Sequence, residues 1–130
     1  MLSDTTSALF SPDPAHVLAA AWDAFDAAGQ VADAVAWEPG SDELQALFAA
    51  QSCAAGRALL PLPESSRPTG VSTPDAGPAG LEPWVTLLRR VHEALTRLST
   101  EQSAEDRTVL EEAARHAAAG ADALAIVRSQ

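Results

Sequence analysis

Alanine is the feature that most restricts how this chain can fold. Of the 61 apolar residues (47% of 130), 29 are alanine, one is cysteine and 31 are Val, Leu, Ile, Met, Phe or Trp. Alanine favours the helix strongly but buries little surface. A core made of these residues therefore needs helices that pack very close together, or a partner that covers additional surface.

The first half of the chain carries two helical patterns. Asp13 is a good N-cap before Pro14, and this helix is expected to end at "WEPG", residues 37–40. A second helix is expected to follow, with Ser41 as its cap and Pro61 as its stop. The apolar stripe of the first helix contains Leu18, Trp22, Phe25, Gly29, Ala32 and Val35, and that of the second contains Leu44, Leu47, Phe48, Ala55 and Leu59.

The second half carries two further helices with apolar residues at alternating steps of three and four, which is the spacing of a bundle seam. Ser99 followed by Gln102 fits a capping box at the start of the last helix. The third-helix seam consists of Trp84, Leu88, Val91, Leu95 and Leu98, and the fourth-helix seam of Leu110, Ala113, Ala117, Gly120, Leu124 and Val127. The small centre of the fourth-helix seam predicts the close approach of a neighbouring helix.

Residues 61–80 separate the two halves, with five prolines and three glycines. This composition is typical of a disordered linker. We therefore expect an all-α four-helix bundle made of two antiparallel hairpins, 13–60 and 81–130, that together form one domain. A flexible arm, 1–12, precedes them, and its Leu9 and Phe10 could dock on the bundle. The linker is long enough for a crossover within one chain or for an exchange of hairpins between two chains.

The formal net charge of −10 disfavours nucleic acid and anionic membrane as partners. Asp23, Asp26 and Asp33 lie with Gln30 along one face of the first helix, so this acidic stripe is a candidate surface for a partner with a basic surface. The simpler interpretation is a solvated face that keeps the protein soluble. No segment has the length of an apolar membrane span, and the first residues lack the features of a signal peptide, so we expect a cytoplasmic protein.

Motifs for catalysis are not found, and we expect a protein without enzymatic activity or cofactor. The sequence lacks HExxH, Glu-x-x-His pairs, a Walker A motif and G-x-S-x-G. Cys53 is the single cysteine, and inside an apolar helix it is expected to be a small buried residue. The candidate metal ligands are His92, Glu112 and His116, with Glu93 beside the first of them, and Glu112 and His116 share a helical face.

Trp37 stands at a helix end beside a turn, where it either anchors a partner or covers the open end of the bundle. With a thin core and no catalytic motif, the sequence favours a non-catalytic helical module for protein–protein interaction: an adaptor, accessory subunit or assembly factor. We expect a homodimer that buries part of the third-helix and fourth-helix seams. The alternative is a helical bundle that binds a small molecule or a metal through His92, Glu93, Glu112 and His116.

Overall fold

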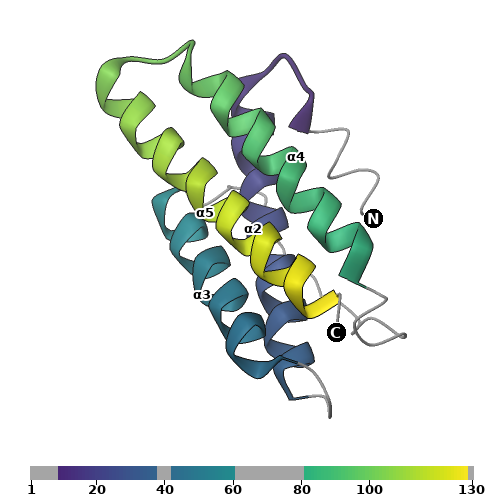
Figure 1. Cartoon of the computed structure of the whole chain (residues 1–130). Coiled ribbons are helices and arrows are strands. Elements are labelled where there is room, and N and C mark those ends of the chain that lie inside the picture. Colours follow the sequence, from purple (N-terminus) through teal and green to yellow (C-terminus); the bar gives the residue numbers. More distant parts are fainter. Residues whose placement is uncertain (1–8, 38–41, 61–80, 129–130) are drawn as a thin grey trace.

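The computed structural model describes residues 9–37, 42–60 and 81–128, and of Arg128 only the backbone. Over these ranges the chain is an all-α four-helix bundle of two antiparallel hairpins without strands, as the sequence predicted (Figure 1). The linker 61–80, the first eight residues of the arm and Ser41 lie outside the described residues. The helices are α2 (Pro14–Ala36), α3 (Glu43–Leu59), α4 (Glu82–Ser99) and α5 (Ala104–Arg128).

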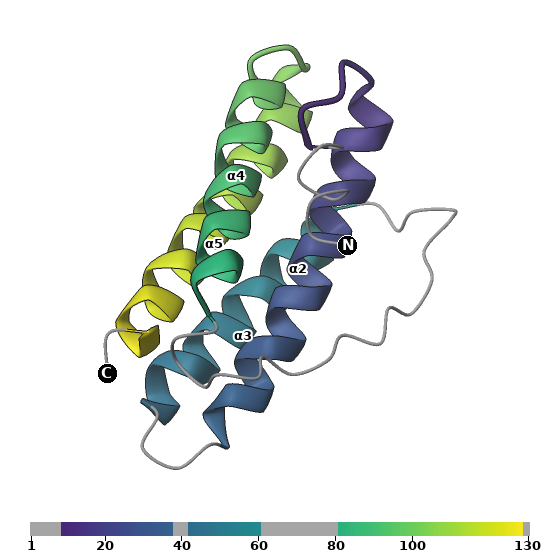
Figure 2. The same ribbon diagram turned by 90° about the vertical axis from the view of Figure 1, so that its right-hand side faces the viewer.

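The helices form a ring in which each neighbouring pair is antiparallel. Besides its hairpin partner, α2 packs on α4 and α3 packs on α5, so that α2 and α5 lie on one diagonal and α3 and α4 on the other (Figure 2). One end of the bundle holds the α4–α5 turn, the start of α2 and the end of α3. The end of α2 and the start of α3 lie at the opposite end, where α4 also begins (Figure 1).

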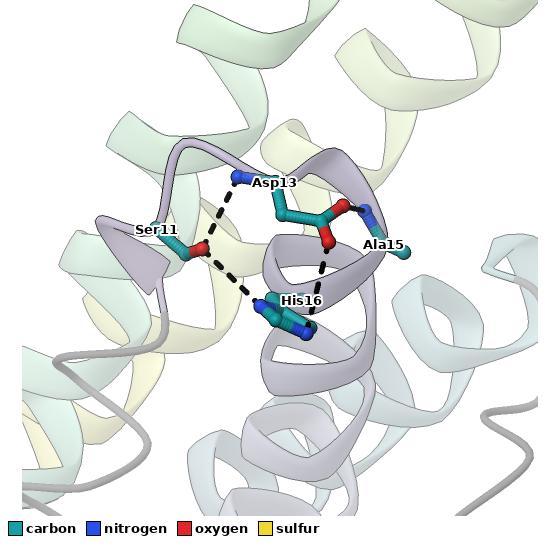
Figure 3. A network of polar contacts seen from close by, with 4 residues as sticks. All are labelled: Ser11, Asp13, Ala15 and His16. Atoms are coloured by element: carbon teal, nitrogen blue, oxygen red, sulfur yellow. Dashed lines mark hydrogen bonds and ion pairs between the residues drawn. The ribbon is translucent and has the colours of Figure 1, made fainter.

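Asp13 caps α2 as predicted. Its Oδ1 accepts a hydrogen bond from Ala15 N at 3.0 Å, and Pro14 occupies the first helical position, where an N–H would have no helical partner. Ser11 Oγ accepts from Asp13 N at 3.1 Å and lies 3.4 Å from His16 Nδ1, while His16 Nε2 lies 3.7 Å from Asp13 Oδ2 (Figure 3). His16 is therefore part of an exposed capping network.

Asp42 caps α3, one residue after Ser41, which the sequence predicted as the cap. Its Oδ1 accepts from Gln45 N at 3.2 Å. Glu43 then stands in the first turn, where the helix dipole favours a negative charge.

The predicted capping box at Ser99 and Gln102 is wrong. Ser99 is the last residue of α4, is buried, and donates its hydroxyl to Thr96 O at 2.6 Å. Four residues of turn follow, and the first intrahelical bond of α5 runs from Arg107 N to Ser103 O at 2.8 Å. The burial of Leu98 and Ser99 keeps the end of α4 helical, so the next helix begins later than the serine pattern suggested.

The third-helix and fourth-helix seams face the core as predicted, and every one of their residues is buried. At the centre of the bundle, a Cβ placed on Gly120 would lie 3.3 Å from Leu88 Cδ1 and 3.6 Å from Cys53 Sγ. The small centre of α5 thus admits both α4 and α3, as the sequence indicated.

The predicted core stripe of α3 is only partly correct, because Leu47 and Leu59 are half-buried against the core but the other large residues are not. Leu44 is 81% exposed and Phe48 is 50% exposed, whereas the buried residues are small ones: Ala46, Ala49, Ser52, Cys53 and Gly56. The small residues recur along the whole helix, but the bulky ones occupy mainly its first half. A close fit of α3 against both α2 and α5 is therefore available only through the small face.

Phe25 supplies the volume that this small face of α3 lacks. Its ring is buried and lies over Gly56, where an added Cβ would come within 2.5 Å of Phe25 Cζ and 2.6 Å of Cε1. The absence of a side chain at Gly56 is thus what lets α2 and α3 pack at this level.

The arm ends in a docked segment. Leu9 is fully buried, and its carbonyl accepts a hydrogen bond from Arg97 Nη2 at 3.0 Å. The Arg97 guanidinium also lies over the half-exposed ring of Phe10, 5.9 Å from its centroid. Leu9 and Phe10 of the arm therefore both make contacts with the bundle.

Gly56→Ala is expected to lower the free energy of unfolding by about 1–2 kcal/mol. The clash with Phe25 costs about 1–3 kcal/mol, and the better helix propensity of alanine returns up to about 1 kcal/mol. Urea unfolding followed by circular dichroism measures the change. Gly120→Ala is the control, because its new Cβ meets the movable methyl end of Leu88, and it should stay within about 0.5 kcal/mol of wild type. Equal effects of the two substitutions would contradict the role given to Phe25.

Candidate protein-binding surface

The outward face of α3 is an exposed, uncharged stripe. Given 3.6 residues per turn, its members lie within about 60° on either side of Gln51, opposite the face that packs in the core. They range from half-buried to exposed. We call them the α3 outer stripe: Leu44, Leu47, Phe48, Gln51, Ala54, Ala55 and Ala58.

The α3 outer stripe differs from an ordinary solvated helix face by its lack of charge. No charged residue occurs between Glu43 and Arg57, in a chain whose net charge is −10. A surface helix normally carries charged residues opposite its core face, whereas a helix that is apolar all round is normally covered on all sides. The α3 outer stripe is thus built like a buried surface but is exposed in the single chain.

Trp37 lies at the same end of the bundle as the bulky part of this stripe. It is the C-cap residue of α2, its side chain is 75% exposed, and α3 begins six residues later. Trp37 therefore does not close the end of the bundle, which was one of the two interpretations of its position. It exposes a large apolar side chain at the end of the bundle where α3 begins.

One residue of the predicted acidic stripe on α2, Asp26, is engaged in contacts within the chain. Asp26 Oδ1 pairs with Arg57 Nη1 at 2.6 Å, Asp26 Oδ2 accepts from Gln30 Nε2 at 3.1 Å, and the Asp26 side chain is only 15% exposed. Arg57 also lies over the ring of Trp22, 5.6 Å from its centroid. Asp33 is exposed. The stripe is thus divided between an α2–α3 clamp and a smaller acidic surface.

Asp23 is half-buried, and burial together with the neighbouring charge of Asp26 raises the pKa of the Asp23 carboxyl. The folded protein therefore binds this proton more tightly than the unfolded chain. As the pH rises through the interval between the unfolded pKa near 3.8 and the raised folded pKa, the free energy of unfolding falls.

Asp23→Asn is accordingly expected to raise Tm at pH 7 by about 1–2 °C, a small effect because the carboxyl is only half-buried and solvent screens its charge. The gain should disappear near pH 3, where the wild-type carboxyl is protonated in both states. Thermal unfolding followed by circular dichroism at pH 3, 5 and 7 measures it. Asp33→Asn, the same change on an exposed carboxyl, is the control and should alter Tm less. A gain from Asp23→Asn that is equal at all three pH values would contradict this assignment.

The candidate metal ligands are engaged in other contacts or exposed. His92 is half-buried, and its Nδ1 donates to Ala114 O at 3.0 Å, a bond that joins α4 to α5. Glu93 accepts from Arg90 Nη1 at 3.0 Å, Glu112 is exposed and His116 is half-buried. Among the described residues no group of three or more His, Cys, Asp or Glu side chains is placed to hold a metal ion.

Cys53 is buried in the α3 core face, as expected, and burial raises the pKa of its thiol to about 12, although nearby Arg57 lowers it in part. A thiol with this pKa is almost entirely protonated near neutral pH, so it is a poor nucleophile and a poor metal ligand. The sulfur serves instead as a packing atom between α3 and Gly120 of α5.

A hollow of about 240 Å³ lies at the opposite end of the bundle, where all four helices meet. Its walls are mainly apolar, and Gln102 and Asp106 are the polar residues that border it. None of the candidate metal ligands lines it. The lining residues are Pro14, Leu18, Leu59, Leu60, Leu98, Gln102, Asp106, Val109 and Leu110.

The two helix seams that were predicted to form a homodimer interface pack inside the single chain instead. The third-helix and fourth-helix seams are buried in the bundle core, so they cannot contact a second copy while the bundle stays closed. The α3 outer stripe was missed because Leu44 and Phe48 were assigned to the core. The signal that could have revealed it is the absence of charge over residues 44–56.

The fold and this surface define a class, antiparallel four-helix bundles in which one helix exposes an uncharged face. Comparison of the chain with protein-family models, with curated proteins and with solved structures gave no match. Within the described ranges, none of the helices combines the length and apolar character needed to span a bilayer.

Proposed function

We propose that this chain is a non-catalytic helical module that works by binding protein, as an adaptor, accessory subunit or assembly factor in the cytoplasm. The observation that carries the proposal is the exposure of Leu44 and Phe48 on a helix face without charge. Exposed apolar residues gathered in a patch, unlike single ones, mark interaction sites.

The energetics of the α3 outer stripe fit a binding surface. Covering a large apolar side chain contributes about 1.5–3 kcal/mol, and both leucine and phenylalanine are available here. Trp37 adds the side chain that most often dominates binding energy at interfaces. Asp33 lies one helical turn before Trp37 and is exposed, so a partner with a basic group could meet this carboxylate at the edge of the contact.

Leu44→Glu with Phe48→Glu is expected to abolish the complex that the chain forms in native extract, because two carboxylates would have to be desolvated on binding. The fold should persist, since both side chains already face solvent. Gel filtration of extract that contains the tagged chain measures the size of the complex, and circular dichroism checks the helix content.

Thr86→Glu with Thr96→Glu is the matched control. It adds the same charge at exposed positions of α4, outside the α3 outer stripe, and should leave the complex intact. If the wild-type chain eluted from extract as a single 13.5 kDa protein, the proposed protein-binding function would be refuted. A complex that survives Leu44→Glu with Phe48→Glu would place the binding surface elsewhere.

The hollow at the α4–α5 turn supports a second candidate function, the binding of a small apolar molecule. Its volume and leucine-rich lining suit a short aliphatic chain. 1-Octanol is expected to raise Tm of the wild-type protein and not that of Val109→Trp, whose larger side chain would fill the hollow. Differential scanning fluorimetry measures both, and no shift for the wild type would rule out this function.

A further inference from the structure

The α3 outer stripe has an ordered distribution of side-chain size. Its large members, Leu44, Leu47 and Phe48, all precede Gln51, and its small members, Ala54, Ala55 and Ala58, all follow it. Large and small residues are therefore separated along the helix axis, with Gln51 at the midpoint. The stripe is exposed or half-buried over its whole length.

We infer that the protein bound to the α3 outer stripe is a second copy of this chain, with the two α3 helices antiparallel and crossing at Gln51. This inference rests on the proposed function and names its partner. A two-fold axis through the midpoint brings each large residue of one copy to a small residue of the other. The facing pairs are Leu44 with Ala58, Leu47 with Ala54 and Phe48 with Ala55.

This pairing satisfies the packing rule that governs helix contacts. Helices approach closely where a large side chain on one meets a small residue on the other. A parallel pair would place Phe48 against Phe48 and alanine against alanine, so the two helices would be held apart at one end and leave a gap at the other. Antiparallel pairing lets them approach evenly along four turns.

Charge complementarity favours the same arrangement. Glu43 precedes the α3 outer stripe, and Arg57, which also pairs with Asp26 of its own chain, stands near its far end. Antiparallel helices bring Glu43 of one copy to the end that carries Arg57 of the other, whereas parallel helices would set Glu43 beside Glu43. Between these residues the stripe is uncharged, so two copies that each carry a net charge of −10 can approach there without desolvating a carboxylate.

The test exchanges the sizes of one facing pair. Phe48→Ala alone and Ala55→Phe alone should each weaken the dimer about tenfold or more, because one loses apolar contact and the other sets two phenylalanines against each other. Phe48→Ala with Ala55→Phe should restore the dimer to within a few-fold of wild type, since each phenylalanine again meets an alanine. Sedimentation equilibrium of the purified proteins measures the dissociation constants.

A cross-link tests the same geometry without changing the size pattern. In a Cys53→Ala background, Gln51→Cys should form an intermolecular disulfide under mild oxidation, because the two position-51 side chains meet at the axis. Gln30→Cys, on an exposed face of α2, should keep a free thiol and form no intermolecular disulfide. Equal cross-linking of the two, or a double exchange weaker than either single substitution, would overturn the antiparallel pair.

The outcome also separates this inference from the proposed function. A purified chain that stays at 13.5 kDa at about 100 μM, yet forms a complex in extract that Leu44→Glu with Phe48→Glu abolishes, would overturn the self-pairing and leave the module standing. A single chain under both conditions would overturn both.

Discussion

The contact between the Phe25 ring and the bare backbone of Gly56 is the constraint on which the rest of the structure depends. Alanine and glycine cannot fill a core by themselves, so the volume must come from a few large side chains that sit against small ones. Phe25 is such a side chain, and Gly56 is the only position of α3 on which its ring can lie so close to the helix axis. This contact sets both the spacing of α2 and α3 and the face that α3 turns inward.

Once the small face of α3 is turned inward, the exposure of its large residues follows. Helical periodicity turns Leu44 and Phe48 about 100° or more away from the centre of the face that holds Ala49, Cys53 and Gly56, so a rotation that buried the large residues would move the small ones out of the core. Burying the leucine and phenylalanine in the core would push α3 away from α2 and α5. Phe25 would then lose its close neighbour Gly56, and Gly120 would lose Cys53. The bundle gains its tight packing by leaving apolar surface outside, and that surface is the basis of the proposed function.

This trade explains which parts of the structure the sequence could predict. In α4 and α5 there is one apolar stripe, and the residues from Trp84 to Leu98 and from Leu110 to Val127 were correctly assigned to the core. α3 has a bulky stripe and a small stripe, and periodicity alone cannot decide between them because the answer depends on what α2 and α5 bring to the contact. The same limit applies to the candidate site. Trp37 was identified by its place at a helix end, whereas the exposure of Leu44 and Phe48 depends on Gly56 facing Phe25, and the absence of charge around them was the one sign of it in the sequence.

The topology allows two complete four-helix bundles to associate through their surfaces, without exchanging hairpins between chains. α3 ends and α4 begins at opposite ends of the bundle, and the 18 residues of α4 imply a separation of about 27 Å. Twenty residues can reach about 66 Å, so the segment 61–80 is long enough to join the hairpins within one chain. An exchange of hairpins is therefore not required to form a dimer. Two complete bundles that meet through α3 would keep their cores intact and leave the hollow at the α4–α5 turn and the exposed carboxylate of Asp33 accessible to further partners.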